Sequence, residues 1–432
     1  MVWFILAVGL VVIGLTGMPI GIGLALMGLT ILRFVAGGGE TLAITSVWNV
    51  FTDFTLSAVP IFIFMGEILL VSGVSTRIYS AVAPLFAAVP GKLLHTNIAV
   101  CTLFGAVCGA STSTAAAVGS VAYPELRSRG YDRRIVVATL AAGGTLGLLI
   151  PPSLSLLLYG ATQGVSIGRL FLAGILPGLM LAAFFMSLIY VLARRNPAIV
   201  PADDTRLPWS ARLKALLSIW PFAILVFSVL GTMYSGLATA TEAAALGVVT
   251  AIGVGMSWGE LTIGKLFRAF LASTRVFSAI GMVMLGALVL AQSLTVLGLP
   301  QEIMSSIGSM NVSKYWVLVL VSLMYLVLGC FFDGISLLLM TLPIVYPVMM
   351  GAGFDAVWTG VIITVLIEIG MLTPPVGMNL FVLTAITDGE VTLAQAAVAS
   401  VPFWLCMLAG VVVLTSWPSI ALVLPNLIMG GP

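Results

Sequence analysis

Two short polar stretches stand inside otherwise apolar sequence, and each carries oxygen atoms suited to binding an ion. The first, residues 109–114, reads GASTST and offers four consecutive hydroxyl groups. The second, residues 330–336, reads CFFDGIS and offers the carboxylate of Asp333. Hydroxyl, carbonyl and carboxylate oxygens suit a hard alkali cation better than a transition metal. The residue types therefore indicate cation binding within an apolar setting.

A pair of prolines follows each polar stretch. Pro151 and Pro152 end the run LGLLIPP, and Pro374 and Pro375 end the run IGMLTPP. Proline lacks an N–H group and clashes with the preceding turn, so each pair must interrupt a helix. A helix broken inside a membrane presents its N-terminal end to anions and its carbonyl end to cations. Each polar stretch would therefore act together with a helix break.

An anionic substrate would lie between the two polar stretches, where it faces hydroxyl groups and the N-termini of the helices after the prolines. The alternative is that small residues only permit close helix packing and that the prolines only kink helices. A proline pair that follows a polar stretch twice favours the site. On this reasoning the substrate-binding residues are Ser113, Thr114, Pro152, Ser336, Gly377, Met378 and Asn379.

The chain contains an internal repeat at an offset of 223 residues. Residues 123–132 (YPELRSRGYD) align with residues 346–355 (YPVMMGAGFD), and the alignment continues without a gap to the proline pairs. At this offset Asp333 falls on Ala110. Matching prolines and glycines at several separate points are not expected from shared hydrophobicity alone. We predict a first repeat over 1–200, a linker over 201–215 and a second repeat over 216–432, with hairpins near 93–126 and 315–347.

The two repeats are predicted to have inverted orientations. The loop at residues 127–134 carries four arginines, whereas its counterpart at 348–357 carries no Lys or Arg. Cytoplasmic loops collect Lys and Arg, so the first loop is expected inside and the second outside. Threading the chain on this basis places fourteen of the seventeen basic residues in the cytoplasm, with Arg33, Arg169 and Lys314 as the exceptions. Both termini are then periplasmic.

The composition requires an all-α polytopic membrane protein. Of 432 residues, 61% are hydrophobic and 7% are charged, whereas a soluble domain carries about 25% charged residues. The first apolar run lacks a basic region and a small-residue cleavage site, so it is expected to be a retained span rather than a signal peptide. The expected spans lie near residues 1–16, 18–36, 54–73, 136–162, 170–193, 216–235, 239–257, 276–298, 359–386 and 397–420.

Catalysis, transition-metal binding and nucleic-acid binding have little support in the sequence. The chain has one histidine, His95, and four cysteines that form no CxxC pair, so neither a His-rich nor a Cys-rich metal site is expected. Glu242 has the spacing of a capping box with Thr239, and a structural role is expected. Glu67 and Glu368 stand inside apolar runs. They could pair with hydroxyl groups, bind a coupling ion or take up a proton.

Three segments carry a resemblance to a known family. They are VCGASTSTAAAVGSVAYPELRSRGYD, GTLGLLIPPS and EIGMLTPPVGMNLFV. They resemble the large membrane subunit of tripartite ATP-independent periplasmic (TRAP) transporters, and the resemblance covers nearly the whole chain. It implies a sodium-driven importer of carboxylates in the bacterial inner membrane that works by an elevator motion and needs no cofactor besides sodium. The resemblance also implies two partners: a small four-helix membrane subunit, expected as a separate chain, and a periplasmic substrate-binding protein.

The resemblance further implies two sodium sites. One falls on the tip of the first hairpin and on the first helix break, and the other falls on the tip of the second hairpin and on the second break. The residues so assigned are Ala110, Ser111, Gly147, Ile150, Ser153, Asp333, Gly334, Thr373 and Val376.

Three other functions compete with this interpretation. A stand-alone sodium/dicarboxylate symporter of the same fold would transport without a binding protein. An intramembrane enzyme would use Asp333 and Glu368 as an acid pair, but these residues are 35 positions apart in the sequence with no fixed geometry. A passive channel would need rings of pore-lining residues and no inverted breaks. A C4-dicarboxylate-like substrate is the broad expectation, with sialic acid, keto acids and other organic acids left open.

Overall fold

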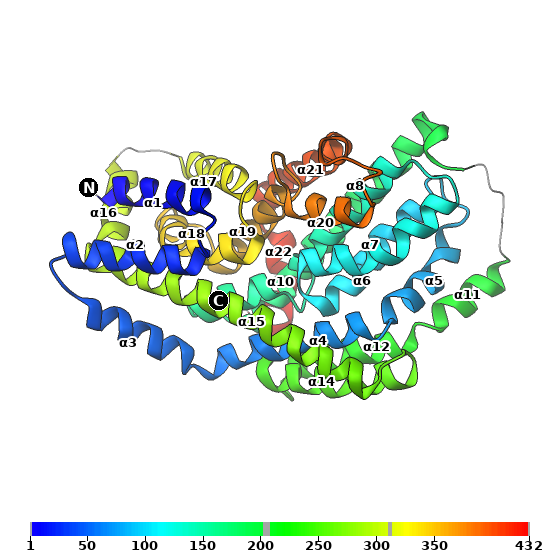
Figure 1. Ribbon diagram of the computed structural model, residues 1–432, viewed down its shortest axis with the longest axis horizontal. Helices are drawn as coiled ribbons and strands as arrows, with labels where there is room; N and C mark the ends of the chain where they lie inside the picture. Colours follow the sequence, from blue (N-terminus) through cyan, green and yellow to red (C-terminus); the bar gives the residue numbers. More distant parts are fainter. Residues whose placement is uncertain (1, 202–207, 310–312, 431–432) are drawn as a thin grey trace.

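The structure is a computed structural model that describes residues 2–201, 208–309 and 313–430, and within these ranges it contains helices and no strands (Figure 1). Its first-half helices are α1 (Val2–Thr16), α2 (Ile20–Phe34), α3 (Glu40–Phe51), α4 (Ala58–Val71), α5 (Val74–Phe86), α6 (Leu93–Cys108), α7 (Ser111–Ser128), α8 (Arg133–Leu149), α9 (Leu154–Gln163) and α10 (Ile167–Arg195). The 3-10 turns η1 (Phe54–Ser57) and η2 (Pro197–Ile199) precede α4 and follow α10.

The second half of the chain continues with helices of the same kind. They are α11 (Trp209–Leu217), α12 (Trp220–Val226), the π-helical turn η3 (Phe227–Gly231), α13 (Thr232–Tyr234), α14 (Ala240–Ser257), α15 (Ile263–Val296), α16 (Leu299–Ser309), α17 (Lys314–Gly329), α18 (Gly334–Gly351), α19 (Ala356–Gly370), α20 (Met378–Ile386), α21 (Leu393–Ser416) and α22 (Ser419–Met429). The expected all-helical fold is therefore confirmed for the described residues.

Seven helical segments of the described chain are long and apolar enough to cross a membrane, so the chain is a multi-pass membrane protein. Several expected spans correspond instead to shorter apolar helices, including α1 and α2, which have 15 residues each. At 1.5 Å per residue such a helix is about 22 Å long, less than the roughly 30 Å hydrocarbon core. Helices α3, α5, α16 and α22 lie largely outside the spans expected from the sequence.

The expected linker at residues 201–215 differs from a simple loop. Residues 202–207 lie outside the described residues, but α11 begins at residue 209 and packs against α5. The helix carries Arg212 and Lys214 among Leu213, Leu216 and Leu217, so its sequence is compatible with an interfacial position. At the other polar boundary, Thr239 and Glu242 form the predicted capping box at the N-terminus of α14.

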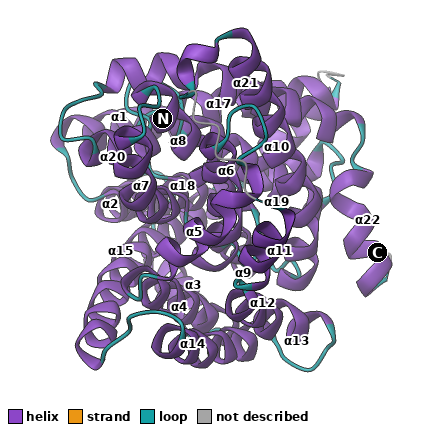
Figure 2. Ribbon diagram, turned by 90° about the vertical axis from the view of Figure 1, so that its right-hand side faces the viewer, coloured by secondary structure: helices purple, strands orange, loops and turns teal. Residues whose placement is uncertain are grey.

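The helices form an outer layer and a central group. Helices α3, α4, α12 and α14 lie along the lower edge in both views, whereas α17 and α21 lie at the top (Figures 1 and 2). Helix α2 packs along α15, and glycines permit their close approach. A Cβ atom on Gly28 would lie 2.8 Å from the backbone of Leu290. Exposed apolar side chains on α1, α3 and α15 are consistent with contact with lipid.

Helices α8 and α19 lie at the centre of the molecule. Every residue from Val136 to Leu149 in α8 is buried, and so is every residue from Val357 to Gly370 in α19. Both helices end shortly before the proline pairs: α8 ends at Leu149, and α19 ends at Gly370. The core of the protein is therefore built from the two helices that precede the breaks.

Candidate functional site

The first polar stretch lies at the tip of the hairpin formed by α6 and α7, directly against the first helix break. The amide of Leu154, the first residue of α9, donates a hydrogen bond of 3.1 Å to the carbonyl of Gly109. Thr114 Oγ1 donates to the carbonyl of Ala110 at 2.8 Å. A Cβ atom on Gly147 would lie 2.7 Å from Thr114 Oγ1, so only glycine allows this approach. The structure thus brings the tip and the break together.

Ser153 stabilises the start of the helix that follows the first break. Its hydroxyl accepts a hydrogen bond of 3.2 Å from the amide of Leu156 and donates to the carbonyl of Leu148. Pro151, Pro152 and Ser153 are all buried. The hydroxyl of Ser153 therefore joins the last turn of α8 to the first turn of α9, and its second lone pair is still available to a cation.

The second polar stretch lies at the tip of the hairpin formed by α17 and α18. Asp333 is the N-cap of α18, and its Oδ2 accepts a hydrogen bond of 3.1 Å from the amide of Ser336. The side chain of Asp333 is half-buried. A capping carboxylate still has free lone pairs, because each carboxylate oxygen can accept more than one bond. Asp333 can therefore cap the helix and bind a cation at once.

The second helix break lies between α19 and α20. Thr373 Oγ1 donates to the carbonyl of Gly370 at 3.0 Å and lies 3.4 Å from the sulfur of Cys330, at the end of α17. The amide of Asn379 donates to the carbonyl of Met371 at 3.3 Å across the break. Gly377 has a φ of +56°, which side chains with a Cβ rarely adopt. The break is thus held by main-chain bonds and a glycine turn.

The two breaks differ in their exposure. Pro151 and Pro152 are buried, whereas Pro374 and Pro375 are exposed. The N-terminus of α9 is capped by Ser153, but Gly377 supplies no side-chain cap for α20. The second break therefore offers the more accessible helix N-terminus for an anion.

A direct hydrogen bond joins the two halves of the predicted site. Asn379 Nδ2 donates to Ser111 Oγ at 2.7 Å and to the carbonyl of Ala141 at 3.2 Å. Asn379 is fully buried, Ser111 is 2% exposed, and Asn379 Oδ1 has no partner in the described structure. Ser155 Oγ, in the first turn of α9, lies 3.0 Å from Thr364 Oγ1 in α19 and also connects the halves. One hairpin tip thus meets the break of the other half.

Some predicted residues are not joined by hydrogen bonds in the described structure. Asp333 makes no hydrogen bond to Thr373 or Val376, the two residues expected to share its sodium ion. Among the described residues, no group of three or more His, Cys, Asp or Glu side chains could hold a metal ion. A cation at this site would therefore depend on main-chain carbonyls and hydroxyls around a single carboxylate.

Sequence reasoning missed a polar cluster around Glu390, in the loop between α20 and α21. Arg127 Nη2 lies 2.5 Å from Glu390 Oε1, Arg133 Nη1 lies 3.5 Å from Oε2, and the hydroxyl of Tyr123 donates to Oε2 at 2.8 Å. The side chain of Glu390 is 19% exposed. Two of the four arginines that predicted a cytoplasmic loop therefore also tie that loop to the other half. No local pattern signals this contact, because the partners are far apart in the sequence.

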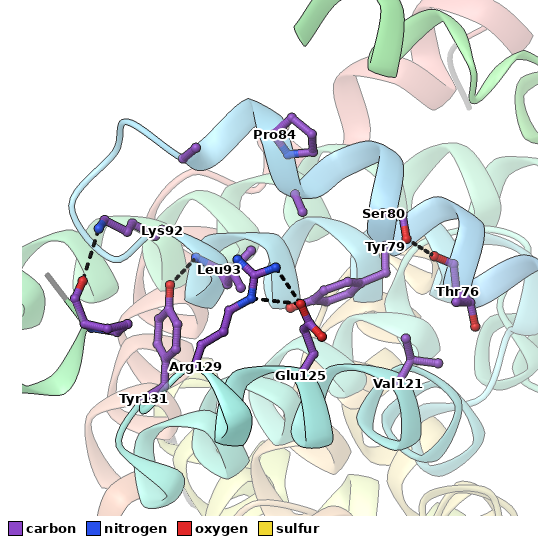
Figure 3. Close-up of a pocket in the computed structure, with 13 residues that line it drawn as sticks. Thr76, Tyr79, Ser80, Pro84, Lys92, Leu93, Val121, Glu125, Arg129 and Tyr131 are labelled. Atoms are coloured by element: carbon purple, nitrogen blue, oxygen red, sulfur yellow. Dashed lines mark hydrogen bonds and ion pairs between the residues drawn. The ribbon is translucent and has the colours of Figure 1, made fainter. Parts of the chain in front are cut away.

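A cavity of about 610 Å³ lies between α5 and α7, away from the hairpin tips and the breaks. Figure 3 shows Arg129 bonded to Glu125, one turn earlier at the C-terminal end of α7, with Tyr79 and Tyr131 also lining the cavity. Lys92 reaches the carbonyl of Pro201 at 3.1 Å at its margin. None of the predicted site residues lines this cavity. The candidate site at Ser111 and Asn379 is therefore separate from this cavity.

Comparison with known proteins matches one family over nearly the whole chain. Residues 7–420 match the model described as "Tripartite ATP-independent periplasmic transporter, DctM component". A C4-dicarboxylate TRAP transporter large permease protein from Pseudomonas aeruginosa is 33% identical over 401 residues, which cover 92% of each chain. A sialic acid TRAP transporter large permease protein from Vibrio cholerae is 28% identical, over 96% of each chain.

A solved structure has a similar fold. It is the YdaH transporter of Alcanivorax borkumensis, with a TM-score of 0.63 and 16% sequence identity, and the match covers 89% of this chain and 90% of that one. At this identity the likeness concerns the fold alone.

Proposed function

The chain belongs to the DctM family of tripartite ATP-independent periplasmic transporters, and from this membership we propose that it is the permease subunit that imports an organic acid across the bacterial inner membrane, driven by sodium ions. The large permease proteins of Pseudomonas aeruginosa and Vibrio cholerae carry C4-dicarboxylate and sialic acid in their names. Both are carboxylates. The substrate class that we propose is therefore a carboxylate, without a choice between these two.

The observation that carries the proposal is the junction between Ser111 and Asn379. It joins a hairpin tip to a helix break at the buried centre of a membrane protein, where an unused polar group is costly. The two tips and breaks offer hydroxyl groups, carbonyls and one carboxylate, which suit sodium. The uncapped N-terminus of α20 beside the exposed Pro374 and Pro375 suits a carboxylate.

The proposal includes an inverted repeat with the binding site between its halves. Helices α7 and α18 begin 223 residues apart, at Ser111 and Gly334, and α8 and α19 also begin 223 residues apart, at Arg133 and Ala356. This agreement supports the repeat. Inverted repeats with broken helices are typical of secondary transporters, and we propose that one group of helices moves against the other as an elevator.

Contacts between loops support the proposed topology. Two contacts join loops that the topology places in the cytoplasm. One is the ion pair between Arg127 and Glu390. The other is the hydrogen bond that the amide of Glu260 donates to the carbonyl of Ser72. Arg169 Nη2 donates to Asn426 at 2.9 Å, and both residues are placed in the periplasm. Loops on opposite sides of a membrane could not touch.

We expect opposite labelling of two engineered cysteines. In a background without native cysteines, Ser128→Cys should react with a membrane-impermeant maleimide only from the cytoplasm, because its loop carries the arginines. Ala352→Cys should react only from the periplasm. Labelling is measured in intact cells and in inverted vesicles. Reaction of both positions from the same side would refute the inverted repeat.

The function is tested by uptake into proteoliposomes that contain this chain, a small membrane subunit and a periplasmic binding protein loaded with a radiolabelled carboxylate. We expect uptake to require a sodium gradient and to rise cooperatively with sodium concentration, because each half supplies one cation site. Full activity in potassium alone would contradict sodium coupling. Uptake without the binding protein would favour the stand-alone sodium/dicarboxylate symporter instead.

A further inference from the structure

Glu368 is a carboxyl group at the centre of the molecule that the proposed transport site does not use. It lies in α19, two residues before the end of that helix, and its exposed fraction is zero. Its neighbours in the helix are buried on all sides, so the side chain faces protein in every direction. The position is thus among the least hydrated in the described chain.

Neither oxygen of Glu368 has a hydrogen-bond partner within the described residues, and no ion pair there includes it. The nearest hydroxyl on the same helix face, one turn earlier, belongs to Thr364. That hydroxyl already donates to the carbonyl of Gly360 at 2.9 Å and lies 3.0 Å from Ser155 Oγ. Glu368 therefore does not pair with a hydroxyl group, which was one of the roles that the sequence left open.

The helices packed against α19 bring no partner for a negative charge to this position. They are α8, α9, α10, α17, α18, α21 and α22. The carboxylate of Asp333, at the start of α18, stands nearby, since a Cβ atom on the adjacent Gly334 would lie 3.0 Å from Ile367 and 3.1 Å from Met371. Within the helices themselves, the charged residues stand in the first or last turn, and no ion pair among the described residues includes Glu368. These residues are Arg133, Arg134, Arg169, Arg194, Arg195 and Lys314.

The uncharged titratable groups on the same helices do not offer Glu368 a hydrogen bond. The hydroxyl of Tyr159 donates to the carbonyl of Ala356 at 2.7 Å, and the hydroxyl of Tyr325 pairs with Thr341 at 2.6 Å. The other groups of this kind are Tyr190, Tyr315, Tyr346 and Cys406. Glu368 thus has neither a counter-charge nor a donor.

An ionised carboxylate is costly in such surroundings. Transfer of an unpaired charge into a low-dielectric interior costs far more than transfer of the neutral acid, so a buried acid normally takes up a proton instead. The neutral acid also gains an O–H group, which can donate to a main-chain carbonyl of a surrounding helix. A bound cation would need several converging oxygen ligands, and among the described residues no group of three or more His, Cys, Asp or Glu side chains gathers around Glu368.

We propose that Glu368 is a proton-binding site, in which the carboxylate has taken one proton from water and is held as the neutral acid in this conformation. The inference rests on the burial of α19 and does not depend on which substrate is transported; Asp333, a residue of the proposed sodium site, stands near Glu368, so the test includes sodium. The same side chain becomes a proton donor in any conformation that admits water to this face of α19. Protonation of Glu368 and the packing of α19 are therefore linked.

The proposal is tested by infrared spectroscopy of the purified full-length chain in nanodiscs at neutral pH. The wild-type spectrum should contain the carbonyl stretch of a neutral carboxyl group, and Glu368→Gln should remove it. Glu302→Gln, which removes an exposed carboxylate in α16, should leave that band unchanged. Because glutamine matches the neutral acid in shape and charge, Glu368→Gln should melt within a few degrees of the wild type.

A second variant guards against a folding defect, and a sodium titration separates the proton from a cation. Glu368→Met keeps the length of the side chain without a polar group and should also lose the band while remaining folded. The band should be equally strong with and without sodium. Absence of the band from the wild type would overturn the proposal. So would a band that disappears when sodium is added, since the site would then hold a cation.

Discussion

Replacing Asp333 with asparagine is expected to lower the affinity for sodium by about tenfold or more, which corresponds to about 1.4 kcal/mol. Asp333 caps α18 by accepting the amide of Ser336 at 3.1 Å. Asparagine caps helices about as well as aspartate, so the substitution keeps the cap and removes only the charge. Sodium affinity is measured from the sodium dependence of uptake in proteoliposomes and from sodium-induced thermal stabilisation of the purified chain.

A matched control separates ion binding from capping. Asp355 caps α19 by accepting the amide of Trp358 at 2.9 Å, in the same geometry but at the other end of that helix from the break. Asp355→Asn should leave the sodium dependence unchanged. Ala110→Asp, at the corresponding position of the first repeat, should not rescue Asp333→Asn, because its charge would belong to the other site. An unchanged sodium dependence in Asp333→Asn would show that Asp333 has a structural role only.

Replacing Asn379 with leucine is expected to reduce uptake by at least tenfold and to destabilise the fold by about 2 kcal/mol. The change removes the donor to Ser111 Oγ and to the carbonyl of Ala141, and it leaves Ser111 buried without that partner. The loss of uptake follows because this amide joins a hairpin tip to the break of the other half. Uptake per folded molecule and thermal unfolding in detergent are the two measurements.

Asn97 provides the control for this substitution. It is also fully buried, donates to Thr139 Oγ1 at 3.0 Å and accepts the hydroxyl of Tyr79 at 3.2 Å, but these contacts stay within the first half. Asn97→Leu should lose a similar amount of stability, yet its folded molecules should still transport. If both variants lose uptake to the same extent, Asn379 contributes to packing alone and the junction is not the site.

Much about this protein follows from local sequence. The low charge and the apolar runs require a membrane protein, because the hydrophobic effect acts on each segment by itself. The proline pairs mark where α8 and α19 end, because proline disrupts the turn that contains it. The capping box at Thr239 and Glu242 was likewise readable, since its partners are three residues apart. Three motifs with their spacing also identified the family.

Only the tertiary structure decided which of these groups meet. The bond between Ser111 and Asn379 joins residues 268 positions apart. The cluster at Glu390 joins two loops that are distant in the sequence. The two helix breaks look alike in the sequence, but Pro151 is buried and Pro374 is exposed. Glu67 and Glu368 both stand in apolar runs, and only the structure shows that Glu368 is fully buried whereas Glu67 is partly exposed. Hydropathy and proline report on neighbouring residues, whereas contacts between halves depend on how whole helices pack, and that packing has no local pattern.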